Sequence, residues 1–259
     1  MRRKYLKHGG MGWIVDRPDH DFLYAAPYAV MRAGLPPATD LRPQSPPIWD
    51  QGQLGSCVGQ GVGYAVHFDW KRQNLPDVTP SRLFIYYNAR VMEHTTSIDA
   101  GCTIRDGIKV IAKFGAPHEH EWPYVITRFA VKPTANAYTD ALLRQSVQYW
   151  SVTKSTTQIK ACLAEGFPVI FGCSVFESFE SDAVANTGVV PLPARGEENL
   201  GGHCMAIVGH DDHTQRFLVR NSWGPGWGIN GYCTMPYSYI TGNLSSSFWT
   251  IRLMEATTT

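Results

Sequence analysis

The sequence predicts an α+β fold with two lobes, because two kinds of periodicity follow one another along the chain. Between residues 57 and 165 apolar residues recur at helical spacing, whereas after residue 166 they form short runs rich in valine, isoleucine and aromatics, separated by turn residues. Helices followed by strands are typical of α+β chains. At 259 residues, 44% of them hydrophobic, the chain can build one large domain or two lobes that share a seam.

The first 39 residues are predicted to form a docked extension rather than a domain. They are rich in proline, glycine and aromatic residues and show no sustained period. The opening MRRKYLKHGG is basic, but its charges are few and interrupted, so we interpret it as a solvated terminus rather than a targeting or nucleic-acid-binding arm. Residues 40–50 then form an extended, proline-rich approach to the first helix.

Five helices are predicted next. In the first, over residues 57–72, the apolar side chains line one face, and Ser56 is the expected N-cap. Glycines in this helix weaken its intrinsic propensity by about 1 kcal/mol each relative to alanine, so packing must hold it. The other helices are expected over residues 80–90, 104–114, 139–146 and 157–165.

Five strands are predicted in the second half, and they are bounded by glycine, asparagine and proline turns. They are expected over residues 168–175, 203–210, 216–220, 231–235 and 247–253.

Composition excludes several classes of protein. The net charge is +1, which gives no electrostatic case for binding nucleic acid or an anionic membrane surface. No stretch reaches the roughly 18 apolar residues of a membrane helix, and no signal peptide is visible. The six cysteines form no C-x-x-C pair, so neither zinc nor another cofactor is expected. A nucleophilic cysteine would leave five, hence an unpaired thiol, which favours a reducing, cytoplasmic location.

Three short patterns are set aside. The glycines at 59, 61 and 63 lack both the G-x-G-x-x-G spacing and a preceding strand, so they do not predict nucleotide binding. The stretches 118–120 (HEH) and 210–213 (HDDH) could bind a metal, but neither has a third ligand that can be placed, and solvated loops are the preferred interpretation.

Cys57 is the first candidate for chemistry because it opens the predicted helix. There the positive end of the helix dipole and the free backbone N–H groups favour the thiolate, which is the nucleophilic form. His203 opens one predicted strand and Asn221 follows another, so a rigid sheet could hold both opposite the helix. An imidazole can exchange a proton with the thiol, and an amide oxygen can orient the imidazole. Taken singly, each residue is weak evidence: an isolated cysteine or strand histidine is usually structural, and Asn221 alone could be a turn residue.

Three blocks of the sequence resemble the papain-like cysteine peptidases. Residues 51–57 (QGQLGSC) are similar to the family's Q-G-x-C-G-S-C, and residues 202–209 (GHCMAIVG) resemble its histidine strand. Residues 221–232 (NSWGPGWGINGY) resemble its N-S-W-G-x-x-W-G-x-x-G-Y block almost letter for letter. Weaker similarity extends the resemblance to about residues 40–253.

The resemblance implies a papain-like fold with the active site in a cleft. The helical lobe would span about residues 40–150, and an antiparallel, β-barrel-like lobe about residues 151–259. It also implies a cysteine peptidase that forms an acyl-enzyme on peptide or protein substrates. The implied roles are nucleophile for Cys57, proton carrier for His203, its orienting residue for Asn221, oxyanion donor for Gln51 and shield of the His–Asn bond for Trp223.

The positions that depart from the family pattern lie outside the candidate catalytic residues, and several of them affect the expected contacts with substrate. Leu54 stands where the family has a cysteine, so Cys102 loses its expected disulfide partner. Residues 103–105 (TIR) replace a glycine-rich run that pairs with the substrate backbone, which makes Arg105 a candidate substrate contact. By similarity, Gly172, Gly201 and Cys204 line the main specificity pocket, and their small size predicts a roomy one.

The short extension is expected to lie across the cleft or its rim and to limit access, as a propeptide does. The alternative is that it packs elsewhere on the surface. Two other functions also stay open: acyl transfer to an amine through the same acyl-enzyme, and a catalytically silent peptide-binding homologue.

Overall fold

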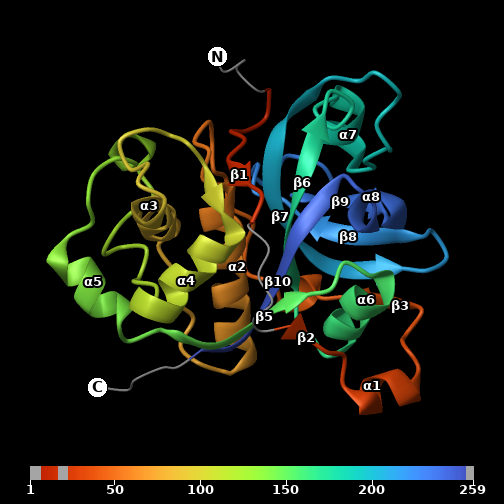
Figure 1. The fold of residues 1–259 in the computed structure, drawn as a ribbon, viewed down its shortest axis with the longest axis horizontal. Helices are drawn as coiled ribbons and strands as arrows, with labels where there is room; N and C mark the ends of the chain where they lie inside the picture. The colour runs from red at the N-terminus through yellow and green to blue at the C-terminus, as the bar shows by residue number, and fades with distance from the viewer. Residues whose placement is uncertain (1–6, 17–22, 255–259) are drawn as a thin grey trace.

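The computed structural model describes residues 7–16 and 23–254 (Figure 1). A helical lobe packs beside an eight-stranded sheet, so the predicted α+β architecture with two lobes is confirmed. The lobe contains α2 (Cys57–Arg72), α3 (Arg82–Met92), α4 (Ile104–Phe114) and α5 (Ala135–Ala141). Among the described residues, no helix is long and apolar enough to span a membrane.

Helix α2 lies between two hydrophobic cores. Val58 and Val62 belong to the core of the helical lobe, whereas Tyr64 and Phe68 belong to the core under the sheet. Such two-sided burial compensates for the low helix propensity of its glycines. Ser56 occupies the N-cap position, but its hydroxyl bonds to the Tyr124 hydroxyl instead of to a helix N–H, so it is not the predicted side-chain cap.

The remaining helices match their predicted ranges except for α5. The helix predicted over 139–146 is wrong: α5 ends at Ala141, and Ser146 already opens a strand. The Thr134 side chain accepts a hydrogen bond from the Ala137 N–H and so starts the helix earlier. The later helices are α6 (Thr156–Ala164), α7 (Asp182–Thr187) and α8 (Tyr237–Thr241), and two 3-10 turns cover Arg42–Gln44 and Ile126–Arg128.

The main sheet has the strand order β2-β5-β10-β6-β7-β8-β9, with β3 paired to β7 beyond the end of β6. All pairs are antiparallel except β2 with β5. Five strands correspond to the predicted ones, and β5 was not predicted. Their bounds are β5 (Ser146–Val152), β6 (Val169–Phe176), β7 (Asn199–Asp211), β8 (Arg216–Arg220), β9 (Tyr232–Pro236) and β10 (Ser245–Met254).

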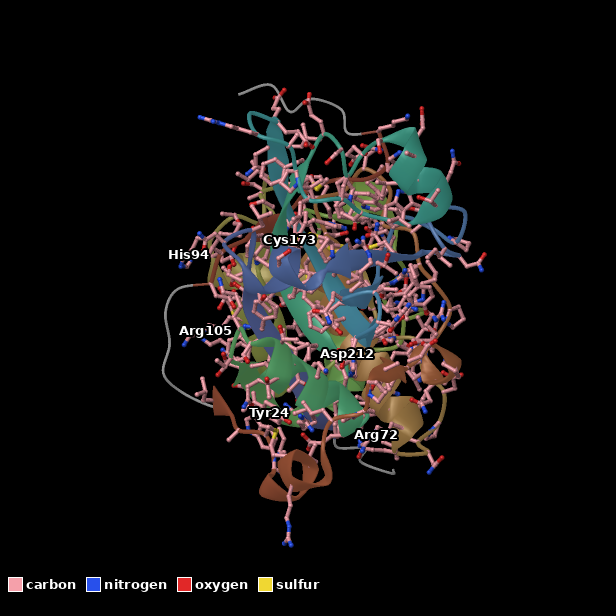
Figure 2. The ribbon with its side chains drawn as sticks, turned by 90° about the vertical axis from the view of Figure 1, so that its right-hand side faces the viewer. Tyr24, Arg72, His94, Arg105, Cys173 and Asp212 are labelled. Atoms are coloured by element: carbon pink, nitrogen blue, oxygen red, sulfur yellow. The ribbon has the colours of Figure 1, made fainter. Side chains whose placement is uncertain are left out.

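The N-terminal extension is more regular than predicted. It contains β1 (Trp13–Ile14), β2 (Leu23–Tyr24), α1 (Tyr28–Ala33) and β3 (Ala38–Asp40), while residues 1–6 and 17–22 lie outside the described residues. These elements take their order from partners distant in sequence: β1 pairs with β4 (Cys102–Thr103), and β2 and β3 join the sheet. Tyr24 of β2 lies toward the lower end of the molecule in Figure 2 and is buried.

Candidate active site

Cys57 is the first residue of α2, and its side chain is fully buried. Burial raises the pKa of the thiol to about 11, because the charged thiolate loses hydration. The backbone N–H groups of Cys204, Gly12 and Val58 lie near the sulfur and act in the opposite direction. The backbone N–H of Cys204 lies at the Cys57 sulfur, and His203 is the preceding residue of β7. β7 therefore brings the candidate imidazole to the N-terminal end of α2.

His203 and Asn221 are joined by a hydrogen bond of 2.8 Å from the imidazole Nε2 to the amide Oδ1. Asn221 Oδ1 also accepts the backbone N–H of Ser222, which fixes the amide. The other imidazole nitrogen, Nδ1, is buried and has no hydrogen-bond partner among the described residues. With the proton on Nε2, Nδ1 keeps the lone pair that a base requires.

Trp223 covers this pair from one side. Its ring stacks on the His203 ring with centroids 4.8 Å apart and an interplanar angle of 26°. Burial lowers the pKa of His203 to about 4, although the bond to Asn221 acts in the opposite direction. Burial thus favours the uncharged forms of both the thiol and the imidazole.

Gln51 is fully buried, and both ends of its side-chain amide are engaged. Its Oε1 accepts a hydrogen bond of 2.6 Å from the Ser222 hydroxyl. Its Nε2 donates to the carbonyl of Leu54 at 2.9 Å and to the carbonyl of Gly10 at 2.8 Å. Sequence reasoning missed Ser222 as the residue that orients Gln51, although its place beside Asn221 in the N-S-W-G block was a usable signal.

Residues 7–16 of the extension lie between the two lobes, where β1 is seen in Figure 1. The Gly12 N–H donates to the Gly202 carbonyl at 3.1 Å, and the Gly12 carbonyl accepts from the Cys102 N–H at 2.8 Å. Trp13 and Ile14 then pair in parallel with Cys102 and Thr103. The segment thus contacts the sheet on one side and the helical lobe on the other.

The glycines of this segment fit too closely to carry a side chain. A Cβ on Gly12 would lie 1.8 Å from the Gly55 carbonyl oxygen, and one on Gly10 would lie 2.5 Å from the Gln53 carbonyl oxygen. A Cβ on Gly9 would lie 2.3 Å from Nε1 of Trp223. The spacing Gly9-Gly10-x-Gly12 was visible in the sequence, and it marks backbone that packs tightly against Trp223 and residues 53–55.

The residues predicted to contact substrate are arranged around the same segment, apart from one. A Cβ on Gly172 would lie 1.9 Å from the Trp13 ring, so this glycine leaves the space that the indole fills. Gly201 lies against the Met11 side chain, and the Arg105 backbone N–H donates to the Asp16 carboxylate. The extension therefore occupies the pocket predicted to be roomy.

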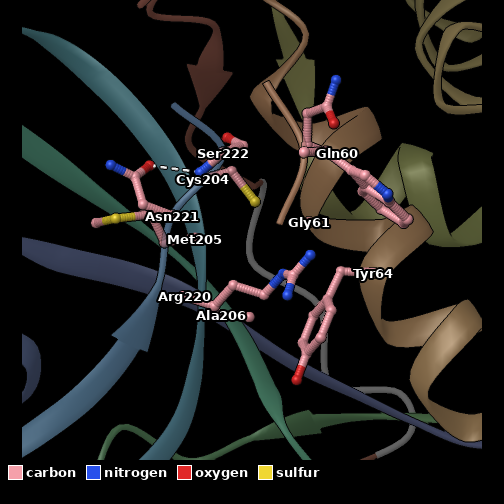
Figure 3. Close-up of a pocket in the computed structure, with 10 residues that line it drawn as sticks. Gln60, Gly61, Tyr64, Cys204, Met205, Ala206, Arg220, Asn221 and Ser222 are labelled. Atoms are coloured by element: carbon pink, nitrogen blue, oxygen red, sulfur yellow. Dashed lines mark hydrogen bonds between the residues drawn. The ribbon is translucent and has the colours of Figure 1, made fainter. Parts of the chain in front are cut away.

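Cys204 lies on the other side of β7, at the seam between the lobes. Its sulfur would lie 2.8 Å from a Cβ on Gly61 of α2, and it lines a small cavity together with Asn221 and Ser222 (Figure 3). The Arg220 side chain extends from β8 toward Tyr64 in the same view, with its guanidinium 4.5 Å from the ring centroid. Cys204 thus contributes its backbone near Cys57, while its side chain packs between the lobes.

The other cysteines and histidines occupy structural positions. All six cysteines are buried free thiols, and Cys102 has no disulfide partner. In the stretch 118–120, Glu119 forms an ion pair with Arg82 at 2.7 Å, and in 210–213 the His210 ring lies near the Thr39 and Tyr237 hydroxyls. Within residues 7–16 and 23–254, no three potential ligands are grouped to hold a metal ion.

Comparison with known proteins identifies the family. Residues 35–246 match the family model described as papain family cysteine protease. An uncharacterized peptidase C1-like protein of Acanthamoeba polyphaga mimivirus is 45% identical over 220 residues, which cover 81% of this chain and 71% of the viral protein. The family match spans both lobes and all three sequence blocks.

Solved structures agree with this assignment. Xylellain, a cysteine protease from Xylella fastidiosa, superposes with a TM-score of 0.90 at 38% identity, covering 98% of this chain and 99% of xylellain. A procathepsin B of Trypanosoma congolense shares the fold with a TM-score of 0.78 at 15% identity, covering 95% and 87% of the two chains. Because these solved structures are of proteases, the comparisons do not favour the two alternatives, an acyl transferase and a catalytically silent binding protein. The chain therefore belongs to the papain family of cysteine proteases and is a cysteine peptidase with the papain-like α+β fold.

Proposed function

We propose that Cys57, His203, Asn221 and Gln51 hydrolyse peptide bonds, and that residues 7–16 hold the enzyme in a latent form. Once the cleft is open to substrate, Nδ1 of His203 takes the thiol proton, and the Cys57 sulfur attacks the scissile carbonyl. The imidazolium then gives the proton to the leaving amine, and water releases the acyl group by the reverse route. Asn221 holds the imidazole, and Trp223 shields their hydrogen bond.

The hydrogen bond from Gln51 Nε2 to the Gly10 carbonyl carries this proposal. A donor held by Ser222 beside the tip of α2 is arranged for a carbonyl oxygen that becomes negative during attack. Here that donor binds a carbonyl of the chain itself, and the Cys57 sulfur is inaccessible. The extension thus occupies the place of a substrate carbonyl.

The direction of the extension predicts that its own peptide bond is a poor substrate. The leaving amine must lie on the side of His203, and that side is marked by Trp223, on which His8 stacks. From the Gly10 carbonyl, however, the chain reaches Trp223 through the preceding residue, Gly9, whereas the scissile nitrogen would belong to Met11. The chain therefore runs opposite to a substrate, and the imidazole lies on the wrong side to protonate this nitrogen.

Replacing Gly12 by alanine tests the latent form. The added methyl group cannot fit against the Gly55 carbonyl, so we expect the segment to leave the cleft and kcat/KM for a short fluorogenic peptide to rise about tenfold or more. Gly226→Ala is the matched control, because a Cβ there meets open space. Equal activity of folded Gly12→Ala and the wild type would contradict the proposal.

A thiol-directed epoxide tests the catalytic roles. Specific labelling of Cys57 in Gly12→Ala, lost in Cys57→Ala, is expected if this thiol is the nucleophile. His203→Ala should slow labelling as well as peptide hydrolysis, since the thiolate depends on the imidazole. Labelling spread over the other five cysteines, with Cys57 unmodified in an active enzyme, would refute the assignment.

We also propose that the enzyme works in a reducing compartment. All six cysteines are free, and the thiol that acts as nucleophile must stay reduced. Measuring activity after equilibration with a series of glutathione redox buffers tests this, and full activity at strongly oxidising ratios would contradict it.

A further inference from the structure

The turn that precedes α7 places acidic side chains beside Trp223. Glu180 is the last residue of the turn after β6, and it is only 7% exposed. Both of its carboxylate oxygens are buried, and neither accepts a hydrogen bond of normal geometry. Neighbouring Phe179 meets the Trp223 ring edge-on, with centroids 5.6 Å apart. Asp182 follows as the first residue of α7 and is exposed. This arrangement ties the acidic turn to the aromatic cover of His203.

The extension places basic residues against this turn. Lys7 forms an ion pair with Asp182, and the backbone N–H of His8 lies near the Glu180 carboxylate. Polar groups between the extension and the turn stay unpaired. Among the described residues, Nε2 of His8 is buried without a hydrogen-bond partner, and no side chain donates to the Glu180 carboxylate. Burial accordingly raises the pKa of Glu180 to about 7. A cationic side chain reaching this carboxylate would satisfy both charges.

The position of the acidic turn relative to His203 and Cys57 determines which part of a bound substrate it would contact. His203 gives its proton to the leaving amine, so the face of Trp223 next to His203 lies on the leaving-group side of the cleft. His8 stacks on the same indole with centroids 6.1 Å apart, so Lys7 and His8 lie beside Trp223, the residue that marks this side of the cleft. Trp13 and β4 lie on the acyl side.

We propose that Glu180 and Asp182 form an acidic subsite that selects a lysine or arginine in the substrate segment following the scissile bond. This inference rests on the proposed function, since it takes residues 7–9 as occupants of the substrate cleft. The buried Glu180 supplies the selectivity, because an ion pair shielded from water is worth more than an exposed one. Exposed Asp182 contributes mainly to attraction at low ionic strength.

The test uses the full-length chain and quenched fluorogenic peptides that differ at one position. Lysine, glutamine or glutamate is placed at each of the first three positions after the scissile bond, and kcat/KM is measured for each peptide. Because the extension excludes all peptides equally, ratios of kcat/KM do not depend on the fraction of open enzyme. At the best position, lysine should exceed glutamine by about ten- to a hundredfold, and glutamate should be poorest.

Variants assign the preference to the carboxylates. Glu180→Gln should bring the lysine-to-glutamine ratio close to one, and Asp182→Asn should lower it mainly at low salt. Glu177→Gln is the matched control: it removes an exposed carboxylate from the same loop and should leave the ratio unchanged. A ratio near one in the wild type, or one unaffected by Glu180→Gln, overturns the subsite alone. Absence of cleavage of every peptide by wild type and by Gly12→Ala overturns the proposed function together with it.

Discussion

At the scale of single residues, Ser222 positions Gln51, the proposed oxyanion donor. The Ser222 hydroxyl holds the carbonyl end of the Gln51 side chain, which turns its NH₂ group toward the carbonyl of Gly10. Backbone pairing of Gln51 with Ser222 adds a second link between the segment before α2 and the segment after β8. An oxyanion donor held in this way needs little reorganisation during attack.

Removal of this support should impair turnover. In a chain that also carries Gly12→Ala, Ser222→Ala should lower kcat about tenfold, less than the roughly 10²- to 10³-fold expected for loss of an oxyanion donor in Gln51→Ala. Steady-state kinetics on a fluorogenic peptide measures both. Ser222→Thr, which retains the hydroxyl, is the control, and an unchanged kcat in Ser222→Ala would show that Gln51 needs no such support.

The raised pKa of Glu180 predicts how the free energy of unfolding depends on pH. Its pKa is raised from 4.5 to about 7 in the folded protein, so its contribution to stability is full below pH 4.5 and is lost as the pH rises to 7. Glu180→Gln cannot ionise, so it should match the wild type at pH 4.5 and exceed its stability by about 2 kcal/mol above pH 7, after allowance for solvent screening. Urea unfolding at both pH values measures this.

The control for that measurement is Glu177→Gln. Its side chain is exposed, so the substitution should leave the stability close to that of the wild type. A Glu180→Gln difference that is the same at pH 4.5 and above pH 7 would show that Glu180 titrates normally.

Sequence reasoning at this scale identified the residues now grouped around Cys57 but not the partners that hold them. Cys57, His203, Asn221 and Gln51 could be picked out because the helix tip and three sequence blocks marked them. Ser222 lies in the third block, but its contact with Gln51 could not be read from the sequence, and Glu180 lies outside all three blocks. Both residues acquire their roles only through neighbours distant in sequence. Their roles, like those of the first four residues, await the experiments above.

At the scale of secondary structure, the extension consists of two parts with different tasks. Residues 7–16 fill the cleft, whereas β2 and β3 complete the sheet by pairing with β5 and β7. β3 takes the place beside Gly209–Asp211 of β7, past the last β6 pair. Strands of two or three residues are set by such partners rather than by their own pattern, which is why the sequence predicted an irregular segment here. The shortened α5 has the same origin, since residues 146–151 belong to the strand that pairs with β10.

Two truncations should separate these tasks. Deletion of residues 1–16 should raise peptidase activity and leave the thermal unfolding temperature nearly unchanged, because the sheet remains intact. Deletion of residues 1–39 should lower that temperature by several degrees, since it removes β2 and most of β3. Calorimetry together with the peptide assay checks both. Equal unfolding temperatures for the two truncated chains would show that β2 and β3 do not support the sheet.

At the scale of the whole molecule, the lobes meet at α2 and at the buried guanidinium of Arg220. Arg220 donates to the carbonyls of Pro46 and Pro47 and lies over the rings of Tyr64 and Tyr232. It thereby links the approach to α2, the helix itself and the sheet. The sequence predicted two lobes from its helix-to-strand order, but it could not show that an arginine beside Asn221 joins them.

Arg220→Lys should weaken this seam. Lysine keeps the charge but cannot stack on the rings and bind two carbonyls at once, so we expect a loss of about 2 kcal/mol in the free energy of unfolding. Arg195→Lys on the exposed surface is the control and should change stability little. Denaturant unfolding compares the two, and equal stabilities would assign Arg220 no part in joining the lobes.

If residues 7–16 block the cleft as proposed, their backward course past Cys57 has a consequence for activation. A blocker that is not cleaved where it binds can return, so activity would depend on a reversible equilibrium between a bound and a released peptide rather than on a single maturation cut. Because the blocker is tethered, its local concentration stays at about the millimolar level however dilute the protein becomes. Dilution alone would leave the enzyme inactive, and a molecule that binds the released strand would activate it.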